Sequence, residues 1–209
     1  MNICHQSPGT LEDEQWEIPE GAQRLHCLCS ANSTLQAGEE ERWMEASTDL
    51  IFPPVPFPSR QLHAQAGAEM LRSLVRRHHE RLLQTEVGKL FPAEPQAFSA
   101  TVETTADFVV EASGGAELFT STQGAMRMRH RHFAVAIDER VREIWLRELL
   151  CSFDDVDFPP SLRETYWRWM EPFSIRMITR RTTREQPVRY PYAVAAERLA
   201  MVTRSGRLV

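Results

Sequence analysis

The chain has 209 residues, of which 42% are hydrophobic, enough for one well-formed core but hardly for two full domains. Its net charge of -5 argues against a general nucleic-acid binder, because such proteins need a basic surface to displace counterions. Four cysteines without a disulfide pattern, no secretory leader pattern and no run of about eighteen apolar residues predict a cytoplasmic protein with no membrane span.

Residues 1–60 are predicted to form a flexible N-terminal extension. They are rich in Glu, Ser, Pro and Gln, show little periodicity, and end in the proline-rich stretch 52–58, which cannot continue a helix or a central strand. The apolar residues of this stretch could still dock on the folded part. His26, Cys27 and Cys29 do not have the spacing of a standard zinc site, so we expect no metal there.

The first predicted helix begins at Gln61, and it is amphipathic. Its apolar face carries Leu71, Leu74, Val75, His78 and Leu82 at helical spacing, whereas Arg72, Arg76 and Glu80 are expected to turn outward. In residues 87–92, Gly and Pro bracket a turn, which leaves Phe91 as an apolar anchor.

Four more helices are predicted along the chain. The first runs from about Gln96 to Ser113, where a Gly-Gly pair stops it, and a short helix then contains the basic run 126–132. The next starts at Asp138, and the last follows Pro160 and should be kinked or interrupted at Pro172. Residues 182–209 form a predicted tail with a short helix around 193–201. Because alternating strand-length runs are missing, the predicted class is all-α.

The basic run Met126-Arg127-Met128-Arg129-His130-Arg131-His132 is the most informative segment. Taken alone, such a run is more typical of a solvated helix start or a phosphate-binding patch. However, Gly114 and Gly115 begin eighteen positions before His132, and Trp145 with Leu146 begins thirteen positions after it. With both spacings, the segment resembles the truncated haemoglobins, most closely their second group. The resemblance covers about residues 64–181 and implies a 2-over-2 helical sandwich over 61–181.

The resemblance implies that His132 is the proximal ligand of the iron of haem b, since neutral imidazole is the usual globin ligand. His130 misses both family spacings by two residues and is not preferred. Arg129 and Arg131 would be the arginines of the family pattern, and a guanidinium suits a haem propionate. Each of the two could equally be a plain solvated charge.

The distal side departs from the family pattern. Truncated haemoglobins usually place Phe-Tyr on the first core helix, where this chain has His78-His79. Aligning the apolar positions puts His79 at the tyrosine site, whereas counting back from Phe91 selects His78, and either ring could donate to a ligand or bind iron itself. A second departure is Ala116-Glu117-Leu118-Phe119 in place of Pro-x-x-Tyr.

The rest of the implied pocket comes from the following helices. Thr101 falls at the distal gate position, Trp145 would lie against the haem, and an indole there can donate to a ligand. The other expected lining residues are Phe91, Phe98, Val102, Thr105 and Val135.

The implied function is reversible binding of O2, NO or another small haem ligand, with NO detoxification or peroxidase-like chemistry as alternative uses. We expect O2 binding rather than dedicated catalysis. An electron-donating reductase is an expected partner, whereas binding to nucleic acid or to a membrane is not expected. A different hypothesis is a haem-free sensor or interaction module, in which side chains at Phe91, Phe98, Val135 and Trp145 fill the pocket. Globins share one fold among such tasks, so fold alone does not choose between them.

Overall fold

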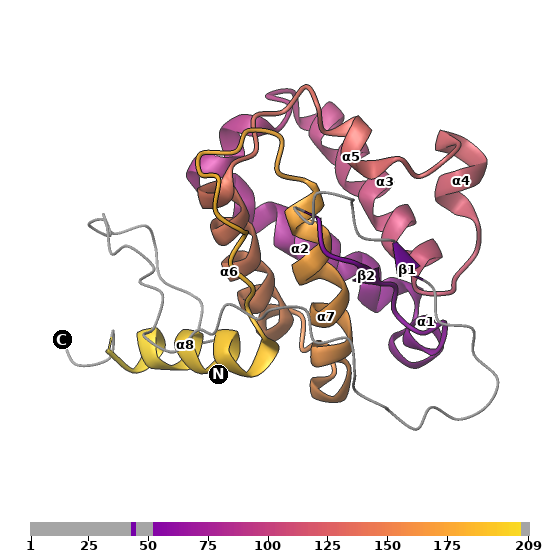
Figure 1. The fold of residues 1–209 in the computed structure, drawn as a ribbon. Coiled ribbons are helices and arrows are strands. Elements are labelled where there is room, and N and C mark those ends of the chain that lie inside the picture. Colours follow the sequence, from indigo (N-terminus) through magenta and orange to yellow (C-terminus); the bar gives the residue numbers. More distant parts are fainter. Residues whose placement is uncertain (1–42, 45–51, 206–209) are drawn as a thin grey trace.

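The computed structural model describes residues 43–44 and 52–205 (Figure 1). Side chains are described from residue 52 to residue 198. Most of the predicted N-terminal extension, including Cys4, Cys27 and Cys29, lies outside these residues. The elements are β1 (Trp43–Met44), β2 (Val55–Pro56), α1 (Gln61–Ala66), α2 (Ala68–Leu83), the 3-10 helix η1 (Glu86–Leu90), α3 (Pro95–Ala112), α4 (Leu118–Gln123), α5 (Met128–Arg131), α6 (Glu139–Asp155), α7 (Pro160–Arg176) and α8 (Tyr192–Ser205).

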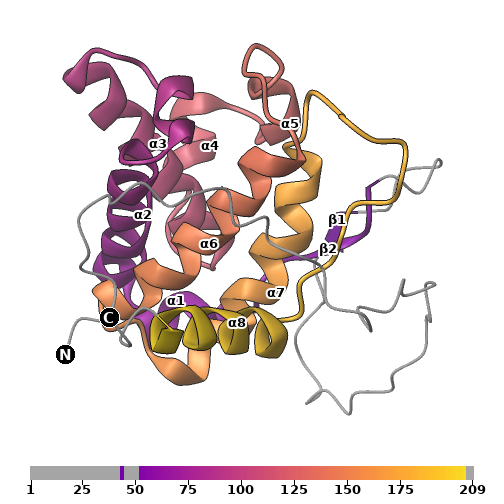
Figure 2. The ribbon, with the colours of Figure 1, turned by 90° about the vertical axis from the view of Figure 1, so that its left-hand side faces the viewer.

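The long helices form two layers of two. Helix α2 packs against α3, and α6 packs against α7, with α2 also lying along α6 so that the layers share one core (Figures 1 and 2). The predicted all-α class and the 2-over-2 sandwich are therefore confirmed. The two-residue strands β1 and β2 form one short antiparallel pair, in which Trp43 lies opposite Pro56.

Local sequence explains where these helices begin and end. Asp138 caps α6, because its side-chain oxygen accepts from the backbone N–H of Val141 at 2.8 Å. Prolines occupy the first turns of α3 and α7, where their missing N–H costs nothing. After α3, Gly114 has φ of +101°, and a Cβ there would lie 2.7 Å from the backbone of Arg60. The glycine is needed both for this turn and for the close approach of α1.

Aromatic side chains dominate the core between the layers. Phe108 of α3 packs against Phe119 and Phe173, and Trp169 of α7 packs against Phe108 and Tyr166. Helix α7 continues through Pro172 to Arg176, so of the two predicted effects of the proline the interruption was wrong, and the kink stays a prediction. Neighbours bury this part of α7 on both sides of the proline, which offsets the lost backbone hydrogen bond.

The charged face of α2 also differs from the prediction. Arg72 and Arg76 do not simply turn outward, because both reach α3: Arg76 Nε donates to Glu103 Oε1 at 2.6 Å, and Arg72 pairs with Glu103 and Asp107. The hydrogen bond from Arg76 holds the pKa of the Glu103 carboxyl below its usual value. These ion pairs join the two helices of one layer along their outer edge.

The proline-rich stretch before α1 lies against α7. Val55 is fully buried, and the Phe57 ring lies 6.0 Å from the Trp169 ring. Arg176 donates from Nη2 to the carbonyl oxygen of Pro53 at 3.1 Å. Residues 52–58 therefore pack on the helical core, while the division at residue 60 stays a prediction.

The segment after α7 returns to the core before α8. Glu171 is buried on α7 and accepts hydrogen bonds from Arg142 Nη2 at 2.6 Å, Arg189 Nε at 2.7 Å and the backbone N–H of Tyr190 at 3.1 Å. Arg142 also donates to the carbonyl oxygen of Val188 at 2.8 Å. A buried arginine and a buried glutamate thus hold the C-terminal segment on α6 and α7. The predicted short helix in this tail is observed as α8.

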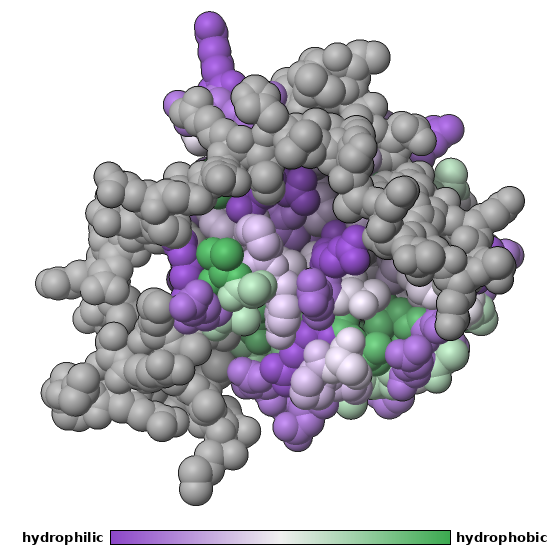
Figure 3. All heavy atoms as spheres, turned by 60° about the horizontal axis from the view of Figure 1, so that its bottom comes forward, coloured by the Kyte–Doolittle hydropathy of each residue, from purple (hydrophilic) through white to green (hydrophobic). Residues whose placement is uncertain are grey.

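The face of the molecule drawn in Figure 3 shows no large apolar area among the described residues. On the face drawn in Figure 3, hydrophilic residues separate small apolar areas wherever the structure describes the chain. Among the described residues, no helix combines the length and the hydropathy that crossing a membrane requires.

Candidate functional site

His132 lies directly after the short helix α5 and belongs to its last turn. Its Nδ1 lies 2.7 Å from the carbonyl oxygen of Met128, four residues earlier. Because a carbonyl oxygen only accepts, Nδ1 carries the hydrogen, and Nε2 keeps an unshared electron pair. Among the described residues Nε2 has no hydrogen-bond partner. This is the arrangement that a metal-binding histidine needs, with one nitrogen held by the backbone and the other available.

The two arginines near His132 make different contacts. Arg131 donates to the carbonyl oxygens of Gln123, Ala125 and Met126, so it braces the loop before α5. The Arg129 guanidinium lies over the Phe52 ring at 4.6 Å and the Phe133 ring at 5.0 Å, and its buried Nε has no partner among the described residues. His130 is exposed and packs on Phe133. A propionate role for either arginine stays a prediction.

His79 lies on the core side of α2 and is almost completely buried, at 8% exposure. Its Nδ1 lies 2.8 Å from the carbonyl oxygen of Val75, so the hydrogen is on Nδ1 and Nε2 has the free electron pair. Burial lowers the pKa of His79, which keeps the ring neutral. The ring packs 5.6 Å from that of Phe91. His79 therefore presents an acceptor nitrogen, in the same tautomer as His132.

His78 is oriented differently. Its Nε2 donates to the carbonyl oxygen of Trp145 at 2.9 Å, and its ring lies edge-on to the indole with 4.6 Å between centroids. Burial, followed by the neighbouring His79, lowers the pKa of His78 well below its usual value. The contact fixes His78 between α2 and α6. Each of the two histidines thus uses one ring nitrogen: His78 binds another helix through Nε2, whereas His79 binds its own helix through Nδ1.

Aromatic rings from three elements adjoin these histidines. Phe91 follows η1 and packs edge-on against Phe98 of α3, with 5.4 Å between centroids, and both Phe91 and Trp145 pack against the buried cluster of Leu82, Val87 and Ile144. All three rings are only partly buried. A role for these rings in lining a haem pocket stays a prediction.

The other predicted lining residues differ in their exposure. Val102 is buried on α3, whereas Thr101 is exposed and Thr105 is half-buried; both threonine hydroxyls donate to carbonyl oxygens of their own helix. These threonines therefore present methyl groups rather than free donors. Val135 is half-buried in the loop that follows His132.

Two backbone carbonyls orient the site. A backbone carbonyl or water is expected at the second ring nitrogen of His132, but neither Met128 nor Val75 was identified from the sequence. Val75 holds His79, and Met128 holds His132, each from four residues earlier. The spacing itself is a usable sequence signal, because a helical histidine can donate back to the carbonyl one turn before it. The described residues contain no group of three or more His, Cys, Asp or Glu side chains that would hold a metal ion without a cofactor.

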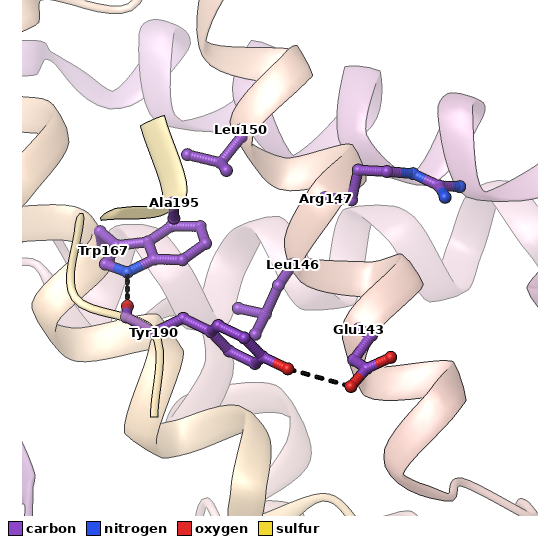
Figure 4. A pocket seen from close by; sticks show the side chains of 7 residues that line it. All are labelled: Glu143, Leu146, Arg147, Leu150, Trp167, Tyr190 and Ala195. Atoms are coloured by element: carbon purple, nitrogen blue, oxygen red, sulfur yellow. Dashed lines mark hydrogen bonds between the residues drawn. The ribbon is translucent and has the colours of Figure 1, made fainter. Parts of the chain in front are cut away.

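A small hollow lies on another face of α6, away from His78. It is lined by Glu143, Leu146, Arg147, Leu150, Trp167, Tyr190 and Ala195 (Figure 4). Tyr190 donates from its hydroxyl to Glu143 at 2.9 Å, and Trp167 donates to the carbonyl oxygen of Tyr190 at 2.6 Å. Its lining groups are mainly engaged in holding the C-terminal segment.

Comparison with known proteins identifies the fold. The family model for bacterial-like globins matches residues 63–179. The chain is similar to Hell's gate globin IV in its phosphate-bound crystal structure, with 47% identity and a TM-score of 0.69, covering 75% of this chain and 98% of that chain. It is also similar to the group II 2-on-2 haemoglobin of Agrobacterium tumefaciens, with 25% identity and a TM-score of 0.51, covering 57% of this chain and 94% of that one.

A third structure shares the fold at lower identity. The truncated oxygen-avid haemoglobin of Bacillus subtilis is 24% identical, with a TM-score of 0.52, and the match covers 56% of this chain and 98% of that chain. No curated protein sequence matches the chain. The resemblance to truncated haemoglobins is confirmed by the model match and by these structures. The chain is a divergent member that belongs to the bacterial-like globin family.

Proposed function

We propose that this globin binds haem b through Nε2 of His132 and that it reversibly binds a diatomic gas, O2 or NO. The observation that carries the proposal is the hydrogen bond from His132 Nδ1 to the carbonyl oxygen of Met128 at 2.7 Å. This bond selects the tautomer, prevents the ring from turning, and raises the basicity of Nε2. When bound, the haem iron supplies a coordination position for the gas.

The distal residues control what lies opposite His132. His79 is held by Val75 and stays neutral, so its Nε2 accepts hydrogen bonds and can also act as a ligand. Donation to bound O2 requires His79 to release Val75 and change tautomer. The partly exposed rings of Phe91, Phe98 and Trp145 support an apolar cofactor beside it.

A peroxidase-like activity is the second candidate, and it also depends on His79. A neutral buried imidazole with a free Nε2 can take a proton from a peroxide and return it to the leaving oxygen. An electron-donating reductase and a cytoplasmic location belong to the same proposal. The family alone implies neither of them, so each needs its own test.

Visible spectra of the purified protein with haem supplied test the proposal directly. We expect a Soret band with one haem per chain, lost or strongly shifted in His132→Ala and unchanged in His130→Ala. His130 is a matched control because it lies two residues away, is exposed and leaves the hydrogen bond of His132 intact. Restoration of the ferrous spectrum of His132→Gly by added imidazole would separate ligand loss from misfolding. Failure of the wild-type protein to bind haem would overturn the proposal and favour an interaction module.

A further inference from the structure

Seven arginines and no acidic residue occupy the two stretches 118–137 and 172–184, although the whole chain has a net charge of -5. The first stretch contains α5, and the second contains the end of α7 and the loop after it. We call the exposed or half-buried side chains Arg127, Arg129, Arg131, Arg180 and Arg184 the basic face. Positive charge is therefore concentrated locally on a protein that is acidic elsewhere.

The fold brings these two stretches together. The backbone N–H groups of Thr179 and Arg180 both donate to the carbonyl oxygen of Ile137 at 2.9 Å, and the N–H of Ile137 donates to the hydroxyl of Thr179 at 3.0 Å. Figures 1 and 2 both place α5 and the segment that follows α7 at the same end of the domain. Burial, and then the nearby Arg129, lower the pKa of Arg176.

The contacts of the basic face leave its charge uncompensated. Arg131 donates to backbone carbonyls, Arg180 donates to the carbonyl oxygen of Thr179 at 3.2 Å, and Arg129 lies over two aromatic rings. Carbonyl oxygens and rings are neutral, so these contacts orient the guanidinium groups without cancelling their charge. Within the described part of the chain, none of the five arginines forms an ion pair with a carboxylate, whereas Arg72, Arg76, Arg77 and Arg81 all do.

The position of the basic face indicates its partner. Its helix α5 ends immediately before His132, so a protein docked on α5 stands next to the residue that holds the haem in the proposed function. Electron transfer weakens steeply with distance, and complementary charge speeds the encounter of two proteins. We propose that the basic face docks an acidic one-electron carrier protein, an inference that rests on the proposed haem binding. The carrier loses one electron, the ferric haem gains it, and no covalent bond changes.

A nucleic acid is the less favoured partner for the same surface. The net charge of -5 would oppose binding along an extended polyanion, whereas a small carrier needs to cover only this end of the domain. The stretch 118–137 also contains His132, the proposed iron ligand. A short distance to the haem would speed electron transfer, whereas nucleic-acid binding does not need it.

Binding of a plant-type [2Fe–2S] ferredoxin with an acidic surface to the ferric holoprotein tests the proposal. The variant is Arg180→Glu with Arg184→Glu, and the control is Arg60→Glu with Arg168→Glu, which reverses two exposed charges elsewhere. At low ionic strength we expect the first pair to weaken binding at least about tenfold and the control by less than about threefold. Added salt should weaken wild-type binding and shrink the difference, because exposed charges are screened.

Several outcomes would overturn the docking proposal. Equal weakening in both double variants would show that only net charge matters, and no wild-type binding at low ionic strength would remove the surface altogether. Tighter binding of a DNA duplex, lost in Arg180→Glu with Arg184→Glu, would assign the surface to a nucleic acid. The Soret band of each sample separates the two proposals: a normal band with no effect on ferredoxin binding refutes docking alone, whereas absence of the band refutes haem binding.

Discussion

Replacing Glu171 by Gln removes the carboxylate that pairs with the buried Arg142 guanidinium while keeping the shape of the side chain. The side chains of Arg142 and Glu171 are 3% and 4% exposed, and their closest atoms are 2.6 Å apart. Arg142 would keep its hydrogen bonds to Ser174 and Val188, at 2.9 and 2.8 Å, but its charge would be uncompensated in a site that water does not reach.

Removal of one partner from a buried ion pair typically costs about 3–5 kcal/mol, because the remaining charge stays desolvated. Domains of this kind have free energies of unfolding of about 5–15 kcal/mol, so the variant should lose a large share of its stability. At about 2–4 °C per kcal/mol for a chain of this length, the unfolding midpoint should fall by roughly 6–20 °C. Burial also lowers the pKa of Arg142, which agrees with a charge that depends on its partner.

Urea unfolding followed by circular dichroism at neutral pH provides the measurement. The matched control is Glu86→Gln, because the Glu86 and Arg140 side chains are 46% and 63% exposed and a surface pair contributes about 1 kcal/mol or less. The double replacement Arg142→Met with Glu171→Leu should recover only part of the loss, since an apolar pair leaves no buried charge but removes the partners of the Tyr190 N–H and the Val188 carbonyl. A loss in Glu171→Gln no larger than in Glu86→Gln would refute the reasoning.

Three further predictions concern the histidines and the glycine turn. Because burial lowers the folded-state pKa of His78 and His79, the unfolded chain takes up protons first as the pH falls below about 6.5. The haem-free protein should then lose up to about 2.7 kcal/mol of stability per pH unit. This slope should disappear in the double variant His78→Gln with His79→Gln, and a slope that persists there would show that other groups cause it. His79→Leu should change the spectrum of the reduced holoprotein from six-coordinate to five-coordinate, and an unchanged spectrum would show that His79 Nε2 does not reach the iron. Gly114→Ala should destabilise the protein by about 2 kcal/mol or more in urea unfolding, because φ is +101° and the new Cβ would meet Arg60. The control Gly124→Ala should cost less, because φ is +71° but no atom lies within 4 Å of the new Cβ. A larger loss in Gly124→Ala than in Gly114→Ala would contradict the packing argument.

Helix positions could be predicted from the sequence because their signals are local. The apolar spacing of α2, the proline at the start of α7 and the cap at Asp138 all depend on residues within a few positions of one another. The continuation of α7 through Pro172 could not be predicted, since it depends on burial by other elements. Helix α4 was also missed, because its six residues carry no apolar periodicity.

The candidate site also has residues that could be predicted from the sequence and contacts that could not. The motif register selects His132 over His130, and the choice between His78 and His79 stayed open because both lie on one helix face. The His79 tautomer follows from the Val75 carbonyl one helical turn earlier, which is a local signal, whereas the His78 tautomer follows from the carbonyl of Trp145, far away in the sequence. The placement of Arg129 over Phe52 depends on a segment far away in the sequence, which no local pattern could indicate.

The hold of Glu171 on the C-terminal segment has a consequence for how the protein is made. A growing chain that has reached residue 181 contains every helix of the 2-over-2 sandwich, yet Arg142 still lacks the carbonyl of Val188, and Glu171 lacks its bonds from Arg189 and Tyr190. Synthesis of a few more residues supplies all three groups together. Vectorial folding of this globin should therefore reach its final stability only after Tyr190 has left the ribosome, later than the helices alone would require.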